Sequence, residues 1–161
     1  MHSSSASSRS GRLSGTVLLT LLAIAAAAPA EAQQGTAPTL VPAVSIRDLM
    51  EKTIAPATDT LWQYYEAPGE ESQWMDIEAA AITMLAATSL TAAGGTGPRD
   101  VEWAGDARWQ AFAQVMRLAA QAALEAARTR DHAALLQAAD AIYPPCEGCH
   151  SAFHPELVGT D

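Results

Sequence analysis

The sequence predicts an all-α protein whose single domain is an antiparallel four-helix bundle. Four segments carry apolar residues every three or four positions, which is the spacing of one helical face. No stretch of the sequence alternates between apolar and polar residues as a half-buried strand does. The shortest link favours antiparallel neighbours, and a chain of 161 residues is long enough for one hydrophobic core.

The N-terminal region, residues 1–32, is predicted to be a secretory signal peptide. Arg9 and Arg12 supply positive charge ahead of an apolar stretch at residues 13–28. Ala30-Glu31-Ala32 then provides the small residues of a cleavage site. The apolar stretch is shorter than the roughly 18 to 20 residues of a spanning helix, so we expect the signal to be removed. The mature protein would be periplasmic and free of the membrane.

A folded domain is expected at residues 44–156, after a disordered lead-in at residues 33–43. Its first helix is predicted from Ser45, a residue suited to the N-cap, to about Glu66. Pro56 should kink or break this helix just before that position. The apolar stripe of the helix is predicted to contain Ile46, Met50, Ile54 or Thr53, Ala57 and Leu61.

Three further helices complete the prediction. The second spans about residues 70–92 and ends at the glycine-rich segment 94–98, after which a link continues to about Gly105. Asp106 is the expected N-cap of the third helix, which ends near Arg128, and Asp131 is the expected N-cap of the fourth. Two prolines at residues 144–145 should bend the fourth helix, which would then restart.

Composition excludes several classes of function. The net charge is −9 at neutral pH, which argues against nucleic acid as a partner because the protein could not neutralise phosphates. An acidic surface fits solubility or a partner with a basic docking patch. No Ser-His-Asp arrangement and no phosphate-binding glycine loop is evident, so we do not expect an enzyme.

The motif that carries chemistry is Cys146-Glu147-Gly148-Cys149-His150. The spacing C-x-x-C-H is the attachment signature of c-type haem, in which the two sulfurs bind the porphyrin and the histidine binds the iron. A disulfide across so short a loop would contribute little stability, and a thioredoxin-type dithiol requires a βαβ setting. A zinc site built from Cys146, Cys149, His150 and His154 is a further alternative, although adjacent ligands make tetrahedral closure awkward.

The ligand on the opposite side of the iron is left open by the sequence. His132 would lie about 27 Å from His150 along a helix of 1.5 Å rise per residue. His154 follows His150 by four positions and would therefore share its helical face. The remaining candidates are Met50, Met75, Met84, Met116, Lys52, a water molecule or no ligand.

The terminal motif, together with Arg47-Asp48-Leu49-Met50 in the first helix, resembles the class II c-type cytochromes. This group contains cytochrome c′ and cytochrome c556, and the resemblance covers about residues 44–154. It implies one haem c, bound covalently through Cys146 and Cys149 with His150 as the proximal ligand. Met50 matches the methionine that is the second iron ligand in the cytochrome c556 branch, whereas in cytochrome c′ the iron stays five-coordinate. The resemblance places Arg47 and Leu49 on the distal side of the haem, and Phe153 and His154 beside the proximal histidine.

Two functions are compatible with this resemblance. A haem with histidine and methionine ligands suits an electron carrier that docks with redox partner proteins. A five-coordinate haem of the cytochrome c′ type would instead bind or scavenge a diatomic gas, nitric oxide or carbon monoxide. Relatives in this class often pair through their first two helices, which makes a homodimer compatible with either function.

Overall fold

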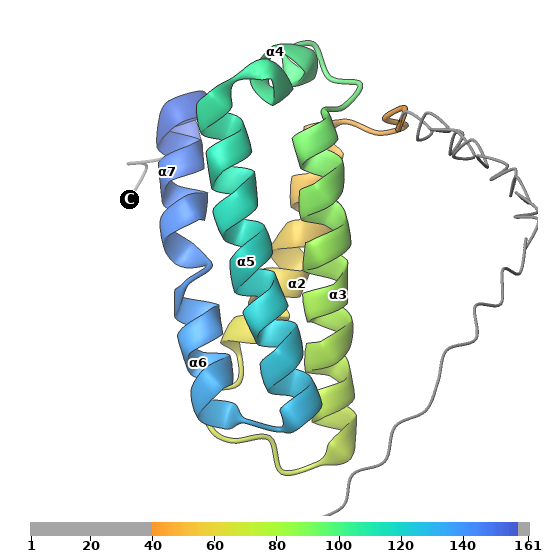
Figure 1. Ribbon diagram of the computed structural model, residues 1–161. Coiled ribbons are helices and arrows are strands. Elements are labelled where there is room, and N and C mark those ends of the chain that lie inside the picture. Colours follow the sequence, from red (N-terminus) through yellow and green to blue (C-terminus); the bar gives the residue numbers. More distant parts are fainter. Residues whose placement is uncertain (1–39, 158–161) are drawn as a thin grey trace, which may run out of the picture. The chain divides into compact units, whose positions relative to one another are not determined.

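The computed structural model describes residues 40–157 of the chain. The predicted signal peptide and the lead-in up to residue 39 lie outside this range. Every regular element within residues 40–157 is helical, which confirms the all-α prediction (Figure 1). None of these helices has the length and hydropathy that crossing a membrane would require.

The first helical segment contains three consecutive elements. They are α1 (Ile46–Leu49), the π-helical turn η1 (Met50–Ile54) and α2 (Ala55–Trp62). Ser45 is the N-cap, as predicted, and its hydroxyl oxygen accepts the Asp48 N–H at 3.0 Å. The segment ends at Trp62, a few residues before the predicted end at Glu66.

The π-helical turn corrects the predicted apolar stripe. Leu49 is buried at 6 % exposure, whereas Met50, which was expected on that stripe, is half-buried. The next buried residue is Ile54, five positions after Leu49, because the Ala55 N–H bonds to the Met50 carbonyl. The disturbance that Pro56 was predicted to cause is therefore a widened turn within a continuous helical segment.

The second and third predicted helices are present almost as expected. They are α3 (Glu71–Ala93) and α5 (Ala107–Thr129), and Asp106 caps α5 by accepting the Arg108 N–H at 2.7 Å. The link between them was predicted to continue to about Gly105, with no helix assigned to it. It instead contains α4 (Asp100–Gly105), which lies across one end of α3 and α5 (Figure 1).

The last predicted helix is divided into α6 (His132–Asp140) and α7 (Tyr143–Phe153). Arg130, in the left-handed conformation at φ 57°, makes the tight turn from α5, and the Asp131 side chain accepts the Ala134 N–H at 2.9 Å. The predicted restart is confirmed, because both prolines lie in the first turn of α7. A short 3₁₀ turn, η2 (Pro155–Leu157), follows.

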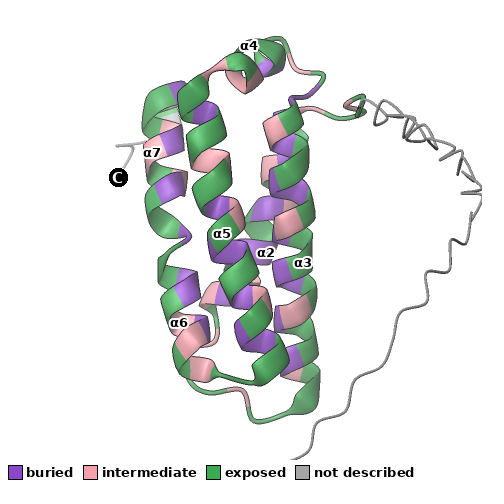
Figure 2. Cartoon of the chain, in the orientation of Figure 1, coloured by how far each residue is buried: buried purple, intermediate pink, exposed green. Residues whose placement is uncertain are grey.

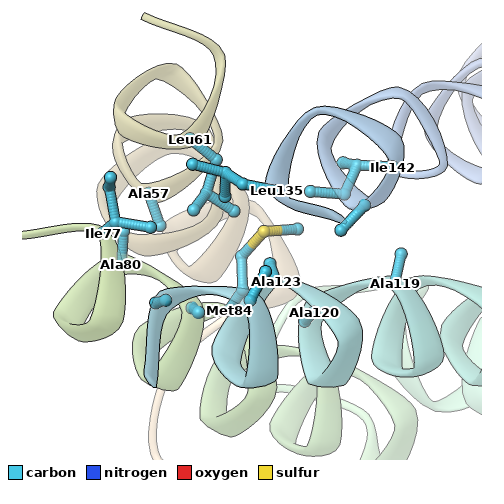
Figure 3. Packing of buried hydrophobic residues seen from close by; sticks show 14 of the residues in the cluster. Ala57, Leu61, Ile77, Ala80, Met84, Ala119, Ala120, Ala123, Leu135 and Ile142 are labelled. Carbon is cyan, nitrogen blue, oxygen red and sulfur yellow. The ribbon is translucent and has the colours of Figure 1, made fainter. Parts of the chain in front are cut away.

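The main core lies where α3 and α5 pack together, with α2 and α6 closing over it (Figures 1 and 2). Alanines on α5 allow the neighbouring helices to approach closely. Met84, which is fully buried, extends between these alanines and the aliphatic side chains of α6 and the turn after it (Figure 3). The fully buried centre contains Ile77, Ala81, Met84, Ala120, Ala123, Ala127, Leu135 and Ile142.

Candidate functional site

A second, smaller core lies at the end of the domain where α7 meets α1. It contains Ile46, Trp109, Cys149 and Phe153, and Met50 packs against its edge. The Phe153 ring meets the Trp109 ring edge-on, with the ring centroids 5.2 Å apart. This aromatic packing fixes the last turn of α7, which carries Cys149 and His150.

Two cavities adjoin this part of α7. The larger has a volume of about 390 Å³, and its walls come from α1, η1, the segment 97–103, the start of α5 and α7. The smaller has a volume of about 190 Å³ and is lined by η1, α2, α5 and α7. Three residues line both cavities: Met50, Cys149 and His150. The two cavities therefore share a residue with a thioether, one with a thiol and one with an imidazole.

Cys146 and Cys149 are not joined by a disulfide. Burial raises the pKa of both thiols, and it raises that of Cys149 to about 11, with a further contribution from the charge of Cys146. Both groups are therefore protonated near neutral pH. A reactive redox dithiol needs a lowered pKa, so this environment argues against that alternative.

The surroundings of the His150 imidazole favour its neutral form. Burial lowers its pKa below the usual value, and the positive charge that His154 can carry lowers it further. A neutral imidazole has the free lone pair that a metal ligand requires. His150 therefore has the protonation state expected of an axial ligand.

Among the methionines, Met50 has the most suitable position. Met75 is 62 % exposed, and Met84 is enclosed in the main core, where the Thr58 hydroxyl lies 3.7 Å from its sulfur. Met116 lines only the smaller cavity, and Lys52 lines neither. Met50 alone among these candidates lines both cavities with His150.

The other residues expected around the cofactor are not all at the cavities. Arg47, Phe153 and His154 line the larger one, and Arg47 forms an exposed ion pair with Glu51 at 2.7 Å. Leu49 is buried and lines neither cavity, because the π-helical turn directs it into the core. His154 ends α7, where its backbone N–H donates to the His150 carbonyl at 2.8 Å.

The remaining histidine of the described residues, His132, belongs to another part of the domain. His132 is the first residue of α6, and its Nε2 lies 3.1 Å from the Tyr64 carbonyl oxygen, just after α2. It lines neither cavity. This position agrees with the prediction that His132 is too far from His150 to be the iron ligand on the opposite side.

Sequence reasoning missed much of the wall of the larger cavity. Trp103 on α4 stacks on Trp109 at 5.6 Å, and the Arg99 guanidinium lies 4.9 Å from the Trp103 ring centroid. The indole N–H of Trp103 is buried and has no acceptor among residues 40–157. A ligand with oxygen atoms could satisfy this donor. The tryptophans themselves were visible in the sequence, but the helix that brings Trp103 to the cavity was not.

Asp100, to which the sequence assigned no role, stabilises the wall of the larger cavity. Its buried carboxylate accepts the backbone N–H groups of Ile46 and Gly97, each at 2.8 Å. Gly95 lies so close to α1 that a Cβ atom would be 2.7 Å from the Ile46 nitrogen. These contacts hold the glycine-rich segment against the start of α1.

Gly148 in the motif has a local structural role. A Cβ atom at this position would lie 2.7 Å from Cε1 of Phe112, on α5. The glycine therefore lets α7 pack against α5 directly beside the two cysteines. The neighbour that requires this space is an aromatic side chain of the protein.

The donor set suits an iron porphyrin better than a bare ion. Within residues 40–157, no three histidine, cysteine or acidic side chains are placed to hold a metal ion together, so the zinc alternative lacks a preformed site. Two thiols, one imidazole and one thioether around apolar cavities match the ligands of a covalently bound haem. The unsatisfied indole N–H offers a donor for an acidic group on such a ligand.

Comparison with known proteins adds no assignment: no family model, curated protein or solved structure matches this chain.

Proposed function

We propose that this protein is an exported monohaem c-type cytochrome of the class II kind and serves as a periplasmic electron carrier. The observation that carries the proposal is the sharing of both cavities by Met50, Cys149 and His150. These residues supply an attachment sulfur and two candidate axial ligands from two elements, η1 and α7. In this proposal, the helices form the antiparallel four-helix bundle of that class, with the haem near α7.

Each residue has a distinct part in this proposal. Cys146 and Cys149 hold the haem through two thioether bonds, which suits thiols that stay protonated near neutral pH. His150 binds the iron from α7 and Met50 binds it from η1. The haem supplies the change of iron valence, and a methionine ligand raises its reduction potential. The aromatic wall of Trp103, Trp109 and Phe153 would keep water from one side of the site.

With Met50 as a second axial ligand, the site would favour electron transfer over gas binding. An iron whose coordination positions are filled changes valence with little rearrangement, which suits transfer to a docked partner. Arg47 and Arg99 line the larger cavity and offer positive charge to the acidic groups of a haem.

The first test is covalent haem attachment. The full chain, produced with the machinery for cytochrome c maturation, should retain haem after denaturation and give a pyridine haemochrome spectrum of a c-type haem. Replacing both cysteines by alanine should abolish the retained haem. Met75→Ala provides a matched control on an exposed methionine and should retain full haem content. Wild-type protein without covalent haem would refute the proposal.

The second test separates a carrier from a gas binder. Absorption and electron paramagnetic resonance spectra of the ferric holoprotein should show six-coordinate low-spin iron. Met50→Ala should convert it to high-spin iron, whereas Met116→Ala should leave it low-spin. A high-spin wild-type iron that rapidly binds carbon monoxide when reduced would instead support the cytochrome c′ type of function.

A further inference from the structure

The helical segment that contains Met50 has an irregular register. Its buried apolar residues are three or four positions apart, as in an α-helix, except between Leu49 and Ile54, which are five apart. At this step, the Ala55 N–H donates to the Met50 carbonyl instead of the Glu51 carbonyl that an α-helix would use. The π-helical turn therefore contains one residue more than an α-helical path would need.

This extra residue determines the direction in which Met50 points. Each α-helical residue turns the chain by about 100°, so one additional residue changes the relation of α1 to α2 by that angle. In an uninterrupted α-helix, Met50 would lie four positions before Ile54 and face the core with it. In the structure, Leu49 is the buried residue of this turn, and Met50 is half-buried, packs at the edge of both hydrophobic clusters and lines both cavities.

Pro56 explains why the turn is widened at this point. Proline has no N–H for the Lys52 carbonyl, and its ring would clash with that carbonyl in a regular α-helix. Glu51 and Lys52 are exposed, so water can satisfy carbonyls that lose an α-helical donor. The Thr53 hydroxyl donates to the Leu49 carbonyl on the same turn. The distortion thus lies where the sequence can accommodate it.

We infer that Pro56 is a positioning residue: through the π-helical turn, it sets Met50 opposite His150 as the second axial ligand. This inference rests on the proposed haem attachment, and it concerns the register of the helix and not the attachment itself. Pro56 is itself exposed and lines neither cavity, so its effect on the iron passes through Met50.

The test compares ferric spin state in Pro56→Ala and in a matched control. Pro68→Ala removes a proline from the loop between α2 and α3 and should leave the iron low-spin. Pro56→Ala restores the missing N–H and lets the segment relax to an α-helix. Most of its iron should become high-spin, with helix content by circular dichroism and covalent haem content close to wild type.

A second variant distinguishes register from general damage. Deleting Lys52 in the Pro56→Ala background removes the extra residue, so a regular α-helix would keep both Leu49 and Met50 in their native directions. This double variant should regain low-spin iron, even if Pro56→Ala alone gives little holoprotein. Failure of the deletion to restore low-spin iron would overturn the inference.

The outcomes also separate this inference from the proposed function. Low-spin iron in Pro56→Ala, with Met50→Ala high-spin, would overturn the role of Pro56 and leave the electron-carrier proposal intact. High-spin iron in the wild type would overturn both the placement of Met50 and the carrier function, but would leave haem attachment standing. Absence of covalent haem in the wild type would refute the proposed function itself.

Discussion

The two cores of this domain are built in opposite ways. Between α3, α5 and α6, small and branched side chains fill the interior, and Ile77, Ala120 and Leu135 are completely buried (Figure 3). Between η1 and α7 lie two cavities of about 390 and 190 Å³, and the larger one has the aromatic side chains of Trp103, Trp109 and Phe153 in its wall. The first region is closely packed by the chain alone, whereas the second has the open space that a large ligand would fill.

Because of this difference in packing, the two regions should have different roles, one in stability and one in function. The close-packed core can hold α3 and α5 together without a cofactor, because its contacts come from the protein itself. The region around α7 has fewer such contacts and contains the residues of the candidate site. Stability and function should therefore respond differently to changes at the two ends.

The largest expected effect is a local loss of protection when haem attachment is prevented. In the protein with both cysteines replaced by alanine, amide hydrogen exchange in α1, η1 and α7 should quicken by at least about tenfold relative to holoprotein. Amides in the middle of α3 and α5 should change much less. Hydrogen exchange followed by mass spectrometry measures both regions in one sample, and equal acceleration throughout would contradict the division.

The next effect should come from overfilling the close-packed core. Ala120→Leu adds a large side chain where no space exists, and it should lower the free energy of unfolding by about 1–3 kcal/mol. Ala122→Leu, on the exposed face of the same helix, should change it by less than about 0.5 kcal/mol. Urea unfolding of both variants tests the contrast. Equal stability of the two would show that the core is loosely packed.

A somewhat smaller effect is expected at the buried carboxylate that supports the cavity wall. Asp100→Ala leaves the N–H groups of Ile46 and Gly97 without their acceptor, and it should cost about 1–2 kcal/mol. Asp100→Asn keeps a side-chain oxygen and should recover much of that loss. Thermal unfolding compares the three proteins. An Asp100→Asn variant as unstable as Asp100→Ala would show that charge, and not the acceptor, is what the wall requires.

The two regions also differ in how well the sequence predicted them. The main core follows from periodicity and capping: Trp74, Ile77, Ala81 and Met84 recur every three or four positions along α3, and all are buried. Periodicity works there because these helices are regular over more than twenty residues. The same method placed Met50 on the buried stripe, where Leu49 lies instead, because a π-helical turn changes the register without changing the pattern of residue types.

The walls of the candidate site depended on contacts that no local pattern reveals. Asp100 is separated from Ile46 by more than fifty residues, and only the folded chain brings the carboxylate to that N–H group. Its bond to Gly97 helps to form α4, which carries Trp103 to the larger cavity. The motif from Cys146 to His150 indicated the chemistry, but the residues opposite it required the structure.

The smallest expected effect concerns Asp106, the N-cap residue of α5 in the close-packed region. Asp106 at the start of α5 has a pKa lowered to about 2, chiefly by hydrogen bonds from the Arg108 side chain and then from its backbone N–H. A carboxylate whose folded pKa is lowered stabilises the fold above its unfolded pKa of 3.8, and this contribution disappears as the pH falls toward 2. Because Asp106 lies at the surface and is partly exposed to water, the change should be small.

Asp106→Asn isolates that charge, since asparagine is also a good N-cap residue. The urea midpoint of the variant should lie slightly below that of wild type at pH 6, and the gap should narrow only below about pH 4. Unfolding curves of both proteins at several pH values provide the measurement. A gap that closes between pH 5 and 7 would assign the dependence to a histidine. A gap unchanged down to pH 3 would show that Asp106 acts as a neutral cap, so that the start of α5 depends on hydrogen-bond geometry and not on charge.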